Sequence, residues 1–224
     1  EITIQLIRFG VKEILLEKPG VAYPAEIFEL EKIAKDFNSK VLIAYNRRFY
    51  SSVMKAQEII KEDGGVRSFC FEFTEWSHVI SKLSKTKAEH ENWFLGNSTH
   101  VIDLAFFLGG KPTQLEAFYQ GSLDWHPASA IFSGSGRTEL GALFSYHANW
   151  VSPGRWWLDV LTKKHRLIFK PFEGLKIQTI GSVAENAVVL DTNLDELYKP
   201  GLYLQTKAFL EGHDERFVDV AEQA

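Results

Sequence analysis

Two short apolar runs near the start most constrain how this chain of 224 residues can fold. They occupy residues 14–16 (ILL) and 41–45 (VLIAY), and runs this short between turn signals indicate buried strands. Apolar residues at helical spacing precede the first run, over residues 2–9, and separate the two runs, over residues 24–37. This alternation of helix and buried strand predicts a parallel α/β sheet with helices on its faces.

The predicted α/β region stops after only two strands, which are too few to bury their own faces. The chain also begins at Glu1, and its only methionine is Met54. Together these features predict a chain cut from a longer one, with the α/β region incomplete at its start.

From residue 47 onward the pattern predicts an α+β region with a mostly antiparallel sheet. Alternating residues over 67–76 indicate a half-buried strand, and residues 77–96 are expected to form a loop. We expect helices over 98–108 and 202–211 and the start of another over 213–224, each of the first two stopped by glycine. Gly134-Ser-Gly136 is interpreted as a hairpin turn. Further strands are expected at 114–120, 130–133, 139–150, 156–162 and 165–170.

Composition excludes several classes of protein. The net charge of −4 argues against a nucleic-acid binder that uses a general basic surface. No apolar run approaches 18 residues, so we expect no membrane span. The only cysteine, Cys70, cannot form an internal disulfide, which is compatible with a reducing compartment.

Lys18 is the first candidate for chemistry, within Glu17-Lys18-Pro19 at the end of a predicted buried strand. Ligands of open α/β sheets bind outside the carboxyl ends of the strands. An ammonium group there can bind a substrate hydroxyl and stabilise an alkoxide that develops on it. The tripeptide alone favours the simpler alternative, a solvated lysine that ends a strand.

His100 and Asp103 form the second candidate, because spacing of three residues places them on one helix face. With an ordinary pKa of about 6.5, a histidine near a helix start can act as a general base. Asn97, Ser98 and Thr99 are expected to cap this helix. The alternative is a histidine held in place by the capping groups and Asp103, and on these residues alone it is favoured.

The other patterns in the sequence give weaker evidence for a functional site. His90-Glu91 begins like a zinc-protease motif, but Phe94 stands where the second histidine is needed, so we predict no metal site. Most of the six tryptophans lie in or beside strands and loops of the second region. Indole faces can stack on sugars, although a core or a subunit interface is the simpler interpretation for most of them.

Each motif is weak alone, but their order along the chain is specific. Glu17-Lys18-Pro19 ends one strand, Tyr45-Asn46-Arg47-Arg48-Phe49 follows the next, His100-x-x-Asp103 opens a helix that stops at Gly109-Gly110, and Gly201-Leu202-x-x-Gln205-x-x-x-Phe209 comes late. In this order the chain resembles the glucose–fructose oxidoreductase / inositol dehydrogenase / MocA (Gfo/Idh/MocA) family over nearly its whole length.

The resemblance implies a Rossmann domain followed by an α+β domain with a large open sheet. Residues 1–46 would be the C-terminal part of the Rossmann domain, and residues 47–224 the domain for substrate binding and oligomerisation. It further implies hydride transfer between NAD or NADP and a hydroxyl or carbonyl carbon of a sugar or polyol. A homodimer or homotetramer formed through the open sheet, in the cytoplasm, is also expected.

The resemblance also implies roles for individual residues. Lys18 would lie beside the nicotinamide and contact the reacting hydroxyl, and His100 would be the general acid/base. The remaining implied site residues are Glu17 and Pro19 at the cofactor, with Asn46, Arg48, Asn97 and Asp103 as substrate-binding, orienting or structural residues.

Two departures from the family pattern leave alternatives open. Gly96 stands where many members have an aspartate four residues before the histidine, and the glycine-rich dinucleotide-binding motif is absent. At roughly 30 residues per βαβ unit, the missing start is on the order of 90 residues. The alternative function is a non-catalytic ligand-binding or oligomerisation module without a complete cofactor site. An unrelated hydrolase or lyase that uses His100 has no supporting nucleophile motif.

Overall fold

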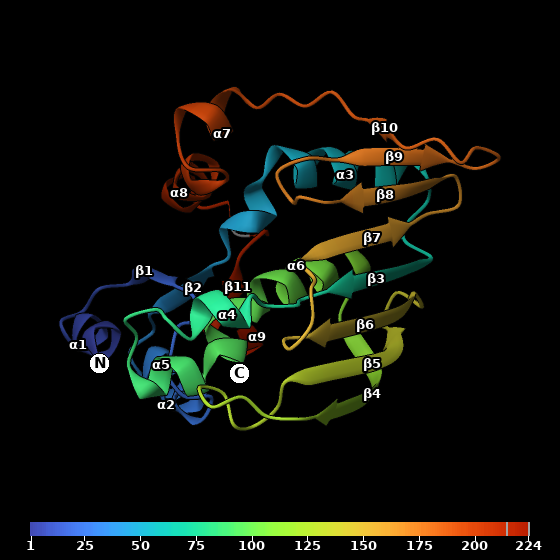
Figure 1. Cartoon of the computed structure of the whole chain (residues 1–224). Helices are drawn as coiled ribbons and strands as arrows, with labels where there is room; N and C mark the ends of the chain where they lie inside the picture. The colour runs from blue at the N-terminus through green and yellow to red at the C-terminus, as the bar shows by residue number, and fades with distance from the viewer. Residues whose placement is uncertain (214, 224) are drawn as a thin grey trace.

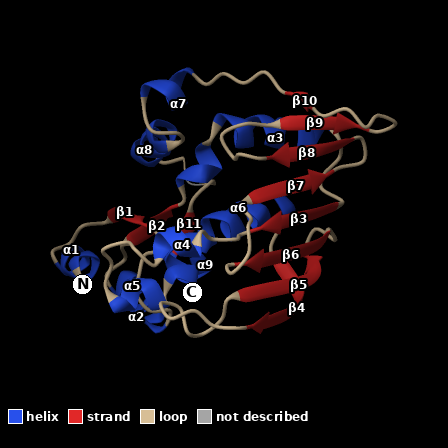
Figure 2. Ribbon diagram, in the orientation of Figure 1, coloured by secondary structure: helices blue, strands red, loops and turns tan. Residues whose placement is uncertain are grey.

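Two sheets organise the chain in a computed structural model that describes residues 1–213 and 215–223 (Figure 1). The smaller sheet has the strand order β1-β2-β11, and the larger has the order β10-β9-β8-β7-β3-β6-β5-β4. Figure 2 shows the larger sheet as a wall of strands at one end of the molecule, with most helices on its inner side or around the smaller sheet.

The smaller sheet confirms the predicted parallel α/β arrangement. Strand β1 (Glu13–Glu17) pairs in parallel with β2 (Lys40–Ala44), so both strands end at the same edge. Helix α1 (Ile2–Arg8) buries Ile7 against it, and helix α2 (Ala25–Asp36) buries Ile27, Leu30 and Ala34.

A third strand, β11 (Val218–Asp219), joins this sheet antiparallel to β2, and α9 (Val220–Gln223) packs beside α2. Near its end the chain therefore returns to the region where it began. The sequence predicts the start of a helix over residues 213–224, but only α9 is helical there, because β11 precedes it. Asp214 and Ala224 lie outside the described residues. The domain boundary after residue 46 stays a prediction.

The larger sheet confirms the predicted mostly antiparallel α+β region, with β3 and β6 as its one parallel pair among the described residues. Its central strand β3 lies against helix α6 (Thr99–Gly109) and buries Phe69, Phe71 and Phe73 on that side. The approach is close: a Cβ on Gly109 would lie 2.2 Å from the Phe69 ring. The strands are β3 (Ser68–Glu72), β4 (Pro112–Gln120), β5 (Ile131–Thr138), β6 (Leu143–Asn149), β7 (Trp157–Leu161), β8 (His165–Phe169), β9 (Lys176–Thr179) and β10 (Asn186–Ala187).

Two expectations for this region are wrong. Gly134 and Gly136 do not form a hairpin turn but lie within β5, where side chains from neighbouring strands cover them. A Cβ on Gly134 would lie 2.4 Å from the Tyr146 ring, and one on Gly136 would lie 1.9 Å from the carbonyl oxygen of Gln114. These glycines therefore serve close packing, and the turn comes later, at Gly141 with its positive φ.

The expected loop over 77–96 is largely helical, because short helical turns with local caps need no long apolar stripe. Thr86 caps α5 (Lys87–Glu91) through a capping box with Glu89. Its neighbours are α4 (Ser77–Ile80) and a π-helical turn (Phe94–Ser98) that leads directly into α6.

The remaining helices connect the two sheets or flank them. A 3-10 turn, η1 (Asn46–Phe49), leaves β2 and leads into α3 (Ser51–Glu62). Helix α7 (Asn193–Leu197) precedes α8 (Leu202–Glu211), which ends at Gly212 in the left-handed region as predicted. Among residues 1–213 and 215–223, no helix is both long enough and apolar enough to cross a membrane.

Candidate active site

The structure brings Lys18 and His100 together at the edge where β1 and β2 end. Lys18 follows β1 directly, and its ammonium donates a hydrogen bond to the backbone carbonyl of Gly96, just before α6. His100 lies in the first turn of α6, with its ring edge-on to Tyr45 at the end of β2 (centroid distance 6.3 Å). The positive charge of Lys18 acts on the His100 imidazole, so residues far apart in sequence lie near one another at this edge.

The Lys18 ammonium is half-buried, and its pKa lies below the ordinary value for a lysine. Burial lowers its pKa to about 8, with a further lowering by Arg47, while Glu17 and Glu75 oppose the change. Among the described residues its one hydrogen-bond acceptor is Gly96, so two of its three N–H groups are free to meet a polar ligand.

His100 is 9% exposed, and its Nδ1 has no hydrogen-bond partner among the described residues. Its pKa falls to about 2 because of burial, and then because of the positive charges of Arg47, Lys18 and Lys199. His100 is therefore a neutral imidazole near pH 7. A neutral imidazole can accept a proton, whereas a charged one cannot.

The low pKa of His100 makes stability depend on pH. Below pH 6.5 the unfolded chain takes up a proton at this residue that the folded chain refuses until about pH 2. The free energy of unfolding should therefore fall by up to about 1.4 kcal/mol per pH unit between roughly pH 6 and pH 4. Urea unfolding of the wild type and His100→Asn across this range measures it. We expect the free energy of unfolding to change less steeply with pH in His100→Asn than in the wild type. The control, His78→Asn, changes an exposed side chain and should leave this slope unchanged. Equal slopes for the wild type and His100→Asn would contradict the low pKa of His100.

Glu75 is a site residue that sequence reasoning missed. It follows β3 and is only 2% exposed, and its carboxylate accepts hydrogen bonds from Asn97 (3.0 and 3.1 Å) and Ser98 (2.9 Å). Burial raises the pKa of Glu75, and these hydrogen bonds oppose that rise. The only available signal was a charged residue directly after the alternating phenylalanines of a half-buried strand.

The expected capping of α6 by Asn97, Ser98 and Thr99 is wrong. Asn97 and Ser98 bind Glu75, and the Thr99 hydroxyl donates to the carbonyl of Leu95 at 2.7 Å. No side-chain cap is needed here, since the preceding π-helical turn supplies backbone acceptors: the Thr99 N–H donates to the Phe94 carbonyl.

Arg48 and Asp103 form a buried ion pair with each other rather than with Lys18 or His100. Arg48 donates two hydrogen bonds to the Asp103 carboxylate, at 2.9 and 2.5 Å, and both side chains are 9% exposed. Burial raises the pKa of Asp103, and the Arg48 guanidinium opposes this. The expected contact between His100 and Asp103 is absent from the described hydrogen bonds. Asn46 likewise binds the chain itself, donating to the Pro200 carbonyl at 3.0 Å.

Arg47 has a different environment from its neighbour Arg48. Its guanidinium carbon lies 4.9 Å from the centre of the Trp156 ring, and Arg155 lies 4.6 Å from the same ring. The His100 ring is also beside Trp156, with a centroid distance of 6.4 Å. The Trp156 indole therefore borders two guanidinium groups and the imidazole of the candidate site. Nothing in the sequence singled it out from the other tryptophans.

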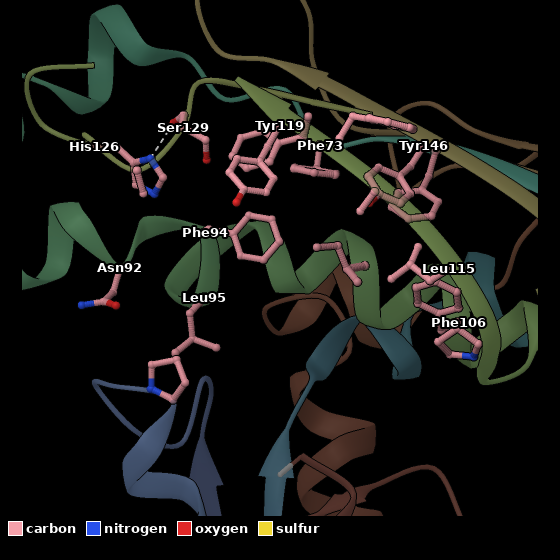
Figure 3. A pocket seen from close by; sticks show the side chains of 18 of the residues that line it. Phe73, Asn92, Phe94, Leu95, Phe106, Leu115, Tyr119, His126, Ser129 and Tyr146 are labelled. Atoms are coloured by element: carbon pink, nitrogen blue, oxygen red, sulfur yellow. Dashed lines mark hydrogen bonds between the residues drawn. The ribbon is translucent and has the colours of Figure 1, made fainter. Parts of the chain in front are cut away.

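An apolar cavity of about 700 Å³ lies elsewhere, between α6 and the larger sheet. Figure 3 shows the rings of Phe73, Phe94, Phe106 and Tyr146 around it, with the hydrogen bond between His126 and the Ser129 carbonyl at one end. Lys18 and His100 do not line this cavity, so it is separate from the candidate active site.

Comparison with solved structures identifies the class of fold as that of NAD-binding oxidoreductases. The inositol dehydrogenase homologue from Azotobacter vinelandii, solved with NADH and myo-inositol, matches with a TM-score of 0.74 and 18% identity over 99% of this chain and 68% of that one. Levoglucosan dehydrogenase, solved with NADH and levoglucosan, matches with a TM-score of 0.69 and 21% identity over 95% of this chain and 66% of that one.

A third match is UDP-N-acetylglucosamine 3-dehydrogenase from Acidithiobacillus ferrooxidans, with a TM-score of 0.72 and 16% identity over 99% of this chain and 69% of that one. The chain therefore has the Gfo/Idh/MocA-type fold that its sequence resembles, and it spans about two thirds of the length of these proteins. No protein-family model matches the chain, and no curated protein matches it.

Proposed function

We propose that this chain is the greater part of an oxidoreductase that moves a hydride between NAD or NADP and a hydroxyl-bearing carbon of a sugar or polyol. The observation that carries the proposal is the meeting of a half-buried ammonium, Lys18, with a neutral imidazole, His100, at the carboxyl end of β1. Oxidation of a carbinol needs a group to accept the hydroxyl proton and a cation to stabilise the alkoxide. Of the three solved proteins named above, which share the fold, one was solved with myo-inositol, one with levoglucosan, and the third is a UDP-N-acetylglucosamine 3-dehydrogenase.

The roles of the residues follow from their environments. Lys18 donates to the substrate oxygen through the N–H groups that Gly96 does not use, and stabilises negative charge on it. His100 accepts the hydroxyl proton and returns it in the reverse direction. Glu75, through Asn97 and Ser98, positions the turn that carries Gly96 and His100. Arg48 and Asp103 hold α6 against the end of β2, and Asn46 holds the segment before α8.

The residues at this edge fit the nicotinamide end of a dinucleotide. The free N–H groups of Lys18 and the unpartnered Nδ1 of His100 mark polar groups with capacity for a ligand. Glu17, Lys18 and Pro19 would contact the cofactor, which supplies the hydride acceptor when bound. The glycine-rich turn that would hold its pyrophosphate does not occur in this sequence.

Subunit association through the larger sheet is part of the proposal. Leu143 on β6 and Phe118 on β4 are 54% and 71% exposed, which leaves apolar surface on the sheet for a second copy. The alternative is a non-catalytic ligand-binding or oligomerisation module. The glycine-rich turn named above does not occur in this sequence, and the chain spans about two thirds of the length of the solved proteins.

Two measurements test the proposal. In the full-length protein we expect NAD(P)H to form or disappear with a panel of sugars, polyols and sugar nucleotides. In the 224-residue chain, calorimetry with NAD and NADP should show weak binding or none. Turnover with no member of the panel, combined with tight binding of sugars, would favour the non-catalytic module.

A further inference from the structure

Arg47 is a partly buried cation without a counterion. Its guanidinium makes no hydrogen bond or ion pair with any described residue, and its Nε is inaccessible to solvent and unpartnered. Its neighbour Arg48, by contrast, binds Asp103 through two hydrogen bonds. Burying an unpaired charge costs free energy, so a guanidinium kept this way needs an explanation such as a ligand.

Further positive charges lie near Arg47. The Arg155 guanidinium contacts the same indole as Arg47, at 4.6 Å from the centre of the Trp156 ring, and lies 4.8 Å from the Trp76 ring. Lys18 and Lys199 act on His100 in the same sense as Arg47, and the charges that most affect this imidazole are all positive. Trp156 Nε1, a further donor in the cluster, is buried and has no partner among the described residues.

The carboxylates nearby do not balance these cations. Glu75 accepts from Asn97 and Ser98 and lies 3.9 Å from Arg155, so it is already engaged. Glu173 acts on Arg47 electrostatically but forms no ion pair with it within 4.0 Å. The cluster of Arg47, Arg155, Lys18 and Trp156 therefore has more hydrogen-bond donors than the described residues satisfy.

From this arrangement we infer that the substrate carries an anionic group, a carboxylate or a phosphate, which Arg47 binds beside Trp156. The inference rests on the proposed function and narrows its substrate class to acidic sugars and sugar phosphates. A guanidinium matches both groups, because its planar N–H donors pair with two oxygens at once. The indole keeps the guanidinium plane in place by cation–π contact.

An anion bound here also improves the chemistry of His100. Burial most disfavours the protonated imidazole, and the positive charges of Arg47, Lys18 and Lys199 add to this effect. A negative charge bound at Arg47 would offset the contribution of these cations and so raise the proton affinity of the imidazole.

Calorimetry on the 224-residue chain with glucuronate, glucose 6-phosphate and glucose tests the inference. We expect one of the two anions to bind at least about 10-fold more tightly than glucose, because hydrogen bonds to charged groups contribute at this level. The tighter of the two identifies the anionic group. Arg47→Met keeps much of the side-chain volume over Trp156 and should remove the preference for the anion. The control, Arg8→Met, changes an exposed arginine of α1 and should retain that preference.

Two results would overturn the inference: equal binding of anionic and neutral sugars, or an undiminished preference for the anion in Arg47→Met. If Arg47→Met does not fold, the wild type alone decides, because rising salt must erode a preference that depends on charge. Binding is read here without turnover. If the chain prefers anionic sugars but the full-length protein changes no NAD(P)H, the proposed function is wrong and the anion site stands. If the full-length protein turns over neutral sugars only, the proposed function stands and the anion site is wrong.

Discussion

Replacing His100 with asparagine should lower kcat of the full-length enzyme by about 10²- to 10⁴-fold, the usual contribution of a positioned proton acceptor. Asparagine is similar in size to the imidazole but cannot take up the hydroxyl proton. Replacing Lys18 with methionine should lower kcat by about 10²- to 10³-fold, because the alkoxide loses its cation. The double variant should be little worse than the single ones, since the two groups serve one step.

Initial rates of NAD(P)H change with the best substrate measure these effects, and circular dichroism shows whether the variants fold. His78→Asn, at an exposed position, is the matched control and should keep wild-type kcat. In the wild type, kcat/KM should also decline as the pH rises through about 8, where the Lys18 ammonium loses its proton. Undiminished turnover in both His100→Asn and Lys18→Met would remove these residues from the mechanism.

The second large effect is on stability. Asp103→Asn removes the carboxylate that pairs with Arg48 in a site where both side chains are 9% exposed, and it leaves the guanidinium buried without a counterion. Loss of one partner of a buried pair typically costs about 3–5 kcal/mol. We therefore expect the midpoint of urea unfolding to fall sharply, with the slope of the transition unchanged.

Two further variants show how much of the lost stability comes from leaving a buried charge unpaired and how much from losing side-chain contacts. Arg48→Met with Asp103→Leu removes both charges and should recover much of the lost stability, because apolar replacements of a buried pair are often tolerated. Glu58→Gln breaks the exposed pair between Lys55 and Glu58, at 2.8 Å, and should change stability by only about 0–1 kcal/mol. A loss in Asp103→Asn no larger than in Glu58→Gln would show that the buried pair does not stabilise the fold.

Much of the fold was accessible to sequence reasoning because apolar periodicity reports burial directly. The runs at 14–16 and 41–45 supply two parallel strands, β1 and β2, as predicted. Prediction failed where local pattern and tertiary contact disagree. Gly134 and Gly136 have the composition of a turn, but their role is to let the rings of β6 and the backbone of β4 come close.

The candidate site divides in the same way. Lys18 and His100 could be proposed from their places after a strand and at a helix start, and the structure brings them together at one edge. Glu75 could not, because its approach to Asn97 and Ser98 depends on how β3 lies against α6.

The sequence by itself determined the class of fold, with a parallel α/β start followed by a mostly antiparallel α+β region, because apolar spacing reports burial. The order of its motifs along the chain also offered Lys18 and His100 as candidates for the proposed chemistry. Only the tertiary structure decided that adjacent arginines have different environments: Arg48 meets Asp103 across 55 residues of chain, whereas Arg47 meets Trp156 and has no carboxylate at ion-pair distance among the described residues. The physical reason is that the energy of a charge depends on what surrounds it in space, and neighbours in sequence point in different directions.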